Sequence, residues 1–144
     1  MMYLLDTNVL SELRKRSSGR IDPQVERWAT KVDPSSLHVS VITVMELELG
    51  IAQLDRRDPR QAAALRLWLH DRVLPAFAGR ILPIDAAIAL RCAHLHVPDP
   101  RSERDAWIAA TGLAHNLTIV TRNSADFAAT GATLLNPWRE GSPL

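Results

Sequence analysis

The feature that most constrains the fold is an alternation of short apolar segments with longer stretches of helical periodicity. The apolar segments lie at residues 3–5, 37–39, 81–84, 117–121 and near 133–137. Segments of this length, bounded by polar or turn residues, are typical of buried strands. Because helical stretches separate them, the strands are expected to run parallel, with helices on both faces of the sheet. The sequence predicts a three-layer α/β sandwich around a mostly parallel central sheet.

The helical stretches begin at residues that favour helix starts. Pro23 and Pro59 stand at first-turn positions that proline tolerates, and Ser40 and Asp85 can cap the helices after them. The expected helices cover residues 7–16, 23–32, 41–54, 59–77, 86–97, 105–116 and a short stretch within 124–130. A chain of 144 residues suits one compact domain, so residues 1–144 are expected to form a single domain.

Charge and cysteine content bear on the environment of the chain. A formal net charge of +1 neither demands nor excludes a polyanionic partner. Cys92 is the one cysteine, so it is expected to be a small buried thiol in a reducing compartment. Asp6 interrupts the first apolar segment too early for a signal sequence, and no apolar stretch approaches the roughly 18 residues that span a bilayer. The chain is predicted to be soluble and cytoplasmic.

Four acidic residues are placed so that they converge on one edge of the predicted sheet. Ligands collect at the carboxyl ends of parallel strands, and Asp6 ends the first strand. Asp126 follows the strand at 117–121 through the sequence TRNS. Asp105 opens the helix before that strand, and right-handed crossovers place such a helix start at the same edge. Glu46 lies more than one turn into its helix, where its longer side chain helps it to reach the others.

This convergence predicts a divalent metal site. Gathered carboxylates repel one another and raise each other's pKa unless a cation is present. Oxygen ligands suit Mg²⁺ or Mn²⁺, which keep several waters and act on phosphates. Such an ion can activate water for in-line attack on a phosphodiester. The sequence has no Gly-x-Ser-x-Gly elbow and no phosphate-binding glycine loop, so the expected chemistry is hydrolysis of a nucleic-acid backbone.

Polar and basic residues near the acids are expected to support this chemistry. Uncharged side chains that could orient carboxylates or metal waters are Asn8, Ser40, Thr121 and Asn123. Three arginines flank two of the acids, where a phosphate backbone would pass. They are predicted RNA contacts: Arg101, Arg104 and Arg122.

Structural roles stay open for each acid. Asp6 and Asp105 could be helix N-caps, Asp126 could cap or turn its segment, and Glu46 could be exposed. Glu48 points to a different side of the helix from Glu46, so it is expected at the rim.

Histidines and tryptophans are expected to be structural. His94 and His96 are two residues apart on a helix and do not share a face, which argues against a metal pair. The tryptophans are expected to pack helices, although Trp28 and Trp68 could also belong to a self-association surface.

Four ordered motifs carry a family resemblance. They are D-T-N from residue 6, S-x-x-x-x-x-E ending at 46, D-x-x-I-A-A from 105 and T-R-N-x-x-D-F from 121. With these motifs the chain resembles the PIN-domain ribonucleases, especially the VapC toxins of bacterial type II toxin–antitoxin pairs. The resemblance spans nearly the whole chain. It implies one PIN-like three-layer domain over residues 1–144.

The resemblance also implies a function. The family's acidic quartet maps onto Asp6, Glu46, Asp105 and Asp126, with Asp6 and Asp105 at the positions most firmly associated with Mg²⁺. The supporting polar positions match Asn8, Thr121 and Asn123. The implied activity is that of an endoribonuclease toxin that cuts RNA with a metal-activated water. Such proteins often form homodimers and are inhibited by a VapB-like antitoxin, which pairs a DNA-binding domain with a tail that wraps the toxin.

Two residues depart from the family pattern, and two other functions stay open. Gly112 replaces the usual alanine, which should weaken its helix by about 1 kcal/mol. Asn116 replaces a frequent glycine and also tolerates the left-handed conformation. A haloacid-dehalogenase-like phosphatase is one alternative, but Asn8 stands where that chemistry needs a carboxylic acid. The other is a catalytically weak PIN-like binding module.

Overall fold

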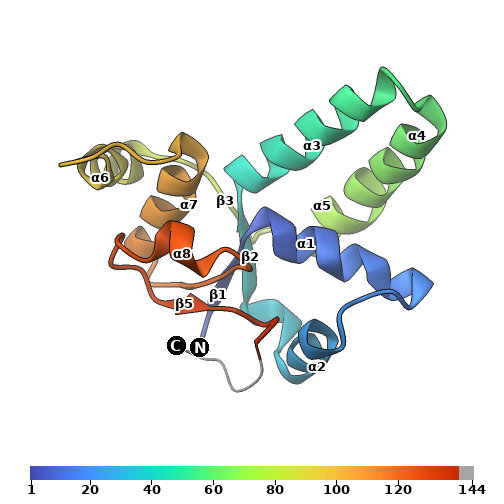
Figure 1. The fold of residues 1–144 in the computed structure, drawn as a ribbon, viewed down its shortest axis with the longest axis horizontal. Coiled ribbons are helices and arrows are strands. Elements are labelled where there is room, and N and C mark those ends of the chain that lie inside the picture. Colours follow the sequence, from blue (N-terminus) through green and yellow to red (C-terminus); the bar gives the residue numbers. More distant parts are fainter. Residues whose placement is uncertain (140–144) are drawn as a thin grey trace.

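One parallel sheet of five strands runs through the computed structural model, which describes residues 1–139 (Figure 1). The strands are β1 (Tyr3–Leu5), β2 (Leu37–Ser40), β3 (Ile81–Leu82), β4 (Thr118–Val120) and β5 (Leu134–Leu135). Their order is β3-β2-β1-β4-β5, and each neighbouring pair is parallel. β1 lies in the middle, with Tyr3 aligned to Leu37 on one side and to Thr118 on the other. The predicted parallel α/β arrangement is confirmed.

Helices connect these strands. They are α1 (Thr7–Leu13), α2 (Pro23–Lys31), α3 (Val41–Asp55), α4 (Pro59–Trp68), α5 (Leu74–Ala76), α6 (Ala86–Leu95), α7 (Glu103–Ala114) and α8 (Ser124–Phe127). Two 3₁₀ segments, η1 (Arg14–Ser18) and η2 (Pro34–Ser36), follow α1 and α2, and a π-helical segment, η3 (Leu69–Val73), joins α4 to α5. None of the helices within residues 1–139 has the length and apolar character needed to cross a membrane.

The predicted helix caps are present. The Ser40 hydroxyl accepts a hydrogen bond from the Ile42 backbone N–H at 3.0 Å, and Asp85 accepts one from the Ile88 N–H at 2.9 Å. Pro23 and Pro59 both occupy first-turn positions. Each cap satisfies a backbone donor that the helix itself leaves free.

Helices cover both faces of the sheet, which gives the domain three layers (Figure 1). Neighbouring strand residues point to opposite faces. Leu5 and Val120 therefore pack in one buried cluster with residues of α1, α3 and α4, whereas Leu4 and Ile119 pack in another with residues of α7 and α8. The helices α6 and α7 meet around the buried thiol of Cys92. Beyond the sheet, the hairpin of α3 and α4 projects away from the other helices (Figure 1).

Some element boundaries differ from those predicted. The third strand ends at Leu82 rather than at residue 84, because Pro83 has no N–H to donate to the ladder. The helix α7 begins at Glu103, so Asp105 lies within its first turn instead of opening it. The helix α1 ends at Leu13, and the chain continues as a 3₁₀ segment.

Gly112 allows α7 to lie close to β4. A Cβ atom at this position would come within 2.9 Å of Cγ1 of the buried Ile119 side chain. The residue therefore permits a close approach in addition to its cost in helix propensity. Asn116 has φ 54°, the left-handed conformation predicted for this helix end.

The tryptophans pack against the core as predicted. Trp28 contacts Tyr3 edge-on, with ring centroids 5.5 Å apart. Trp68 packs against the same cluster as Trp28, and Trp107 packs where α6 meets α7. A self-association role for Trp28 and Trp68 stays a prediction.

Candidate active site

Asp6 lies at the carboxyl end of the central strand, where it is also the N-cap of α1. Only 6% of the residue is exposed. Its Oδ1 accepts a hydrogen bond from the Thr7 backbone N–H at 2.8 Å. Its Oδ2 accepts from the Thr121 hydroxyl at 2.8 Å and from the Asn8 side-chain amide at 3.2 Å. The structural and functional roles considered for Asp6 are thus compatible, because capping uses only one carboxylate oxygen.

A second layer of hydrogen bonds joins the start of α1 to the loop after β4. The Asn123 backbone N–H donates to the Thr121 hydroxyl oxygen at 3.0 Å, and the Arg122 N–H donates to the Asn8 side-chain carbonyl at 3.2 Å. Asn8, Thr121 and Asn123 therefore lie around Asp6, as the sequence predicted. Ser40, which was predicted to support the acids as well, instead caps α3, where its hydroxyl accepts from the Ile42 backbone N–H.

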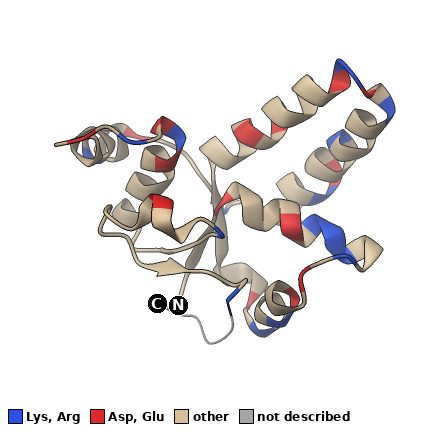
Figure 2. Cartoon of the chain, in the orientation of Figure 1, with Lys and Arg blue, Asp and Glu red and all other residues tan. Residues whose placement is uncertain are grey.

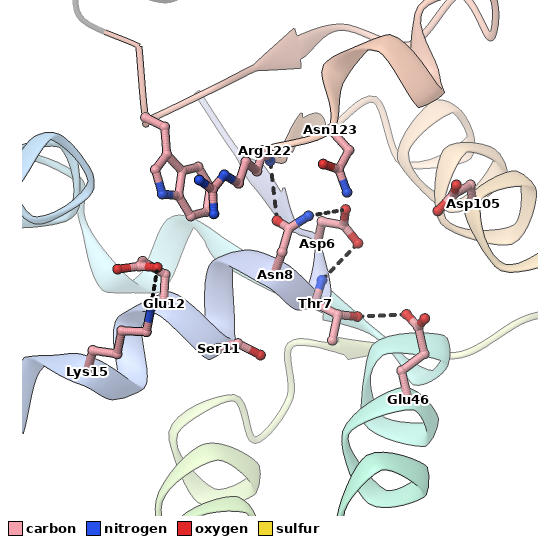
Figure 3. Close-up of a pocket in the computed structure, with 11 residues that line it drawn as sticks. Asp6, Thr7, Asn8, Ser11, Glu12, Lys15, Glu46, Asp105, Arg122 and Asn123 are labelled. Carbon is pink, nitrogen blue, oxygen red and sulfur yellow. Dashed lines mark hydrogen bonds and ion pairs between the residues drawn. The ribbon is translucent and has the colours of Figure 1, made fainter. Parts of the chain in front are cut away.

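Glu46 reaches the same region from α3. Its Oε1 accepts a hydrogen bond from the Thr7 hydroxyl at 2.7 Å, and its Oε2 lies 3.6 Å from the Arg104 guanidinium. The Thr7 hydroxyl oxygen is also 3.1 Å from that of Thr43, which is fully buried. Figure 3 shows Thr7 between Asp6 and Glu46, with its backbone toward one carboxylate and its hydroxyl toward the other.

Asp105 approaches from the opposite helix, α7 (Figure 3). It is half-buried, and burial is the main cause that raises its carboxyl pKa above 3.8. The negative charges of Asp6, Asp126 and Glu46 raise it further. Asp126 is exposed on α8. The four predicted acids are therefore close enough for the other three to raise the pKa of Asp105, although Asp126 itself is exposed at the margin of the group.

Burial also raises the pKa of Asp6. The nearby charge of Glu46 acts in the same direction, while hydrogen bonds from Thr121, Thr7 and Asn8 partly oppose the rise. The net effect of the fold is to raise the pKa of the Asp6 carboxyl, which disfavours its ionised form. A cation beside Asp6 would reverse that preference, because it favours the ionised form.

These side chains line a cavity of about 460 Å³ at the carboxyl edge of the sheet. Asp6, Glu46 and Asp105 all contribute to its wall. The sequence analysis did not identify several other lining residues, namely Thr7, Ser11, Glu12, Lys15 and Trp138. Thr7, Ser11 and Lys15 recur at intervals of four along α1 and its 3₁₀ extension, and Glu12 lies three residues before Lys15, so these side chains share one side of the helix. With Asp6 at the start of the helix, this spacing in the sequence could have predicted that these side chains face the same side as the acids.

The carboxylates differ in one respect from the expectation that all four lie within range of one ion. Within residues 1–139, no group of three or more His, Cys, Asp or Glu side chains is close enough together to hold a metal ion. The donors still fit a hydrated Mg²⁺ or Mn²⁺, since ions of this type keep several waters and need only one or two direct carboxylates.

The three predicted RNA-binding arginines have different surroundings. Arg104 pairs with Glu46, and Arg122 lines the cavity with its guanidinium 5.3 Å from the centre of the Trp138 ring. Arg101 donates from Nε to the Leu95 carbonyl at 2.8 Å. In Figure 2, acidic positions on α1, α3, α7 and α8 surround the carboxyl edge, while basic positions follow the end of α1 and line α4.

Comparison with known proteins identifies the family. The family model of the PIN domain matches residues 3–132. The chain is 37% identical to the VapC ribonuclease Y4jK of Sinorhizobium fredii, over 95% of this chain and 98% of that protein. It is also 37% identical to toxin FitB of Neisseria gonorrhoeae, over 96% of this chain and 100% of FitB.

A solved structure of FitAB bound to a DNA fragment aligns with a TM-score of 0.87 and 32% identity, over 99% of this chain and 100% of that one. Together with the acidic site, these matches define the class of protein as a PIN domain. The chain belongs to the PIN-domain family and, within it, to the VapC-type ribonuclease toxins of type II toxin–antitoxin systems. PIN-domain nucleases are metal-dependent. The dehalogenase-like phosphatase alternative is therefore without support.

Proposed function

We propose that this chain is an Mg²⁺-dependent endoribonuclease that hydrolyses RNA phosphodiester bonds and also accepts Mn²⁺. The acidic quartet in this proposal is Asp6, Glu46, Asp105 and Asp126. The observation that carries it is the cavity at the carboxyl edge of the sheet, where Asp6, Glu46 and Asp105 share one wall. Burial raises the pKa of Asp105, and the neighbouring carboxylates raise it further, so a cation among them would favour the ionised form.

Each acid has a distinct part in the proposed site. A bound divalent cation would supply Lewis-acid chemistry, by acidifying water and neutralising phosphate oxygens. Asp6 offers a carboxylate whose orientation three hydrogen bonds fix. The Thr7 hydroxyl orients Glu46 toward the same cavity. Asp105 and Asp126 add negative charge from the opposite side, which completes the attraction for a hydrated ion.

Basic side chains at the cavity would position the substrate. Arg122 and Lys15 line its wall, Lys15 with its ammonium 3.1 Å from Glu12, and Arg104 lies beside Glu46. Phosphate contacts of this kind fix the register of a nucleic acid without reading its sequence. RNA binding by these residues should therefore weaken with salt and be tolerant of sequence.

The regulatory partner is proposed from the relatives. FitAB, to which this fold is similar, was solved bound to DNA. We infer that a VapB-like, DNA-binding antitoxin holds this chain inactive, and that the chain forms a homodimer. Co-expression with the protein encoded by the neighbouring reading frame tests the first point. Copurification of the two proteins with loss of RNA cleavage is expected, whereas a toxin that stays free and active would refute it.

Asp6→Asn tests the catalytic proposal. RNA cleavage in Mg²⁺ should fall to background, because the amide cannot hold the cation as a carboxylate does. Circular dichroism and a melting curve should show a folded chain, since asparagine retains an oxygen that can accept a hydrogen bond. Cleavage by the variant at the wild-type rate would refute the metal assignment and favour the binding-module alternative.

Glu46→Gln and Glu48→Gln form a matched pair on α3. Glu46 lines the cavity, whereas Glu48 pairs with His70 at 3.3 Å outside it. Only Glu46→Gln should slow cleavage. Equal losses from both substitutions would indicate a general effect of charge on RNA binding instead of a role in the site.

A further inference from the structure

A second cavity, of about 560 Å³, opens beside the acidic one. Glu46 and Asp105 line both cavities, so the two adjoin at these carboxylates. The second cavity has apolar walls formed by Ile42 and Met45 of α3 and by Trp107 of α7. None of these three side chains has a part in the proposed hydrolysis.

The apolar wall is a surface on which a flat group could lie. Trp107 is partly buried, and it packs on the cluster between α6 and α7 while also facing the cavity. Met45 is 40% exposed although it is a large apolar residue. An indole ring and a thioether are both favourable neighbours for aromatic groups. The apolar wall of the cavity therefore suits an uncharged aromatic group.

Charge distinguishes the two cavities. Lys15 and Arg122 line the acidic cavity, where phosphates would be held. The second cavity has one basic lining residue, Arg104, whose guanidinium is paired with Glu46 at the boundary between the two. Its one acidic residue away from that boundary is Glu103, on the side of α7. A nucleotide lying across this boundary would place its phosphate among the charged groups and its base against the apolar wall.

We propose that the Trp107 cavity binds the base of a nucleotide that flanks the cleaved phosphodiester, with the base stacked on Trp107 and Met45. This inference rests on the proposed RNA hydrolysis. Single-stranded RNA is recognised largely through unstacked bases that lie on aromatic side chains. The adjoining position of the two cavities at Glu46 and Asp105 favours this occupant over a second copy of the chain.

Two substitutions at Trp107 separate stacking from packing. Trp107→Leu keeps an apolar side chain against α6 but removes the ring, whereas Trp107→Phe keeps a ring. With a short single-stranded RNA in Mg²⁺, Trp107→Leu should lower kcat/KM about tenfold, toward the lower end of what loss of one base stack produces. Trp107→Phe should recover most of that loss. Melting curves of each full-length variant check that the chain is folded.

An abasic substrate supplies the matching change in the RNA. One substrate carries an abasic nucleotide immediately 5′ of the cleaved bond, and a second carries it immediately 3′. One of these two changes should lower the wild-type kcat/KM about tenfold, as Trp107→Leu does. The Trp107→Leu variant should lose little more with that substrate, because the contact is already absent. Equal losses from the abasic substrate in both proteins would overturn the proposal.

Met45→Ala keeps the test valid if the tryptophan variants unfold. Met45 is partly exposed, so its truncation should leave the fold intact and lower kcat/KM by about threefold. Leu67→Ala is the control, since Leu67 is 62% exposed on α4 and should leave cleavage unchanged. If Met45→Ala and Trp107→Leu cleave RNA normally but light scattering shows that they no longer form dimers, the proposal is overturned. The surface then belongs to an interface with a second copy of the chain.

Binding measurements separate this inference from the proposed function. Fluorescence anisotropy with the Asp6→Asn chain reports affinity for the same RNA without cleavage. Adding Trp107→Leu to that chain should raise the Kd about tenfold. A wild-type chain that cleaves no RNA, together with this loss of affinity, would refute the hydrolysis and retain the base site. Cleavage that is normal in every Trp107 and Met45 variant would retain the hydrolysis and refute the base site.

Discussion

The two sides of the acidic cavity differ in how firmly their carboxylates are held. On the side of β1 and β4, Asp6 is buried and accepts hydrogen bonds from a backbone N–H, an amide and a hydroxyl. On the side of α7 and α8, Asp105 is half-buried and Asp126 is exposed, so solvent reaches both. One side is preorganised by the sheet, and the other can adjust when a cation arrives.

This difference fits a site that binds a hydrated cation together with a flexible substrate. A fixed carboxylate supplies geometry, because its lone pairs are already oriented. More exposed carboxylates supply charge and can move by small rotations as phosphate and ion enter. Residues that hold Asp6 should therefore matter more, per hydrogen bond, than residues around Asp105.

Loss of the Thr121 hydroxyl should have the largest effect. Thr121 is fully buried, donates to Asp6 and accepts from the Asn123 N–H. Thr121→Val removes both bonds, so we expect about 1–3 kcal/mol less free energy of unfolding. Cleavage should fall roughly 10–100-fold because Asp6 loses its orientation. Urea unfolding and initial rates measure the two effects.

Thr130→Val is the matched control for this prediction. The Thr130 hydroxyl is also buried, donates to the Phe127 carbonyl at 2.7 Å and accepts from the Ala132 N–H at 3.2 Å. It should lose similar stability and retain cleavage. Equal losses of activity in both valine variants would mean that Thr121 acts only through stability.

Mg²⁺ should raise the melting temperature by several degrees near pH 7 and by much less near pH 4. The folded-state pKa values of Asp6 and Asp105 are raised above 3.8, so in the metal-free chain their contribution to stability falls as the pH rises through those values. Above them both carboxyls are ionised and repel, and Mg²⁺ relieves that repulsion. Melting curves in Mg²⁺ and in EDTA provide the measurement. Equal melting temperatures in Mg²⁺ and EDTA at both pH values would count against a cation at this site.

Asp105→Asn should stabilise the metal-free chain at neutral pH, by roughly 1–3 °C. The substitution removes a charge that Asp6, Glu46 and Asp126 disfavour. The gain should shrink as the pH falls, because the raised pKa of Asp105 lets the wild-type carboxyl take up its proton before an ordinary aspartate does. Asp126→Asn should give a smaller gain, because Asp126 is exposed. A loss of stability in Asp105→Asn at pH 7 would show that this side is held as firmly as Asp6.

The smallest effect is expected from Arg104→Ala. Its pair with Glu46 spans 3.6 Å and the arginine side chain is 49% exposed, so the change in stability should stay below about 0.5 kcal/mol. RNA affinity should lose part of its salt dependence, with the slope reduced by about 0.7 for one phosphate contact. Arg60→Ala, at the exposed start of α4, should leave the slope unchanged. Titrations of RNA at several salt concentrations distinguish the two.

Local signals predicted the sheet and the position of Asp6. Strand ends and caps depend on neighbours in the sequence, so the roles of Pro23 and Ser40 could be read directly. The start of α7 was placed two residues late, although Ser102 at its N-cap and Asp105 three residues on form a pattern typical of a helix start.

Contacts between distant elements could not be predicted. The bond from Thr7 to Glu46 depends on how α3 crosses α1, and the contact of Arg122 with Trp138 depends on the course of the chain after β5. The distances between the carboxylates could not be predicted either, because they depend on how α3 and α7 pack beside the sheet. Sequence order indicates which edge the acids share, but not how far apart they stand.

The central position of β1 has a consequence for the timing of activity during synthesis. Asp6 is made well before its hydroxyl partner, Thr121, which lies 115 residues later in the chain. The strand that carries Asp6 also lacks one neighbour until β4 has been translated. A ribosome-bound fragment that ends before β4 thus has the first acid without the groups that orient it. The acidic site can therefore assemble only after β4 has been translated.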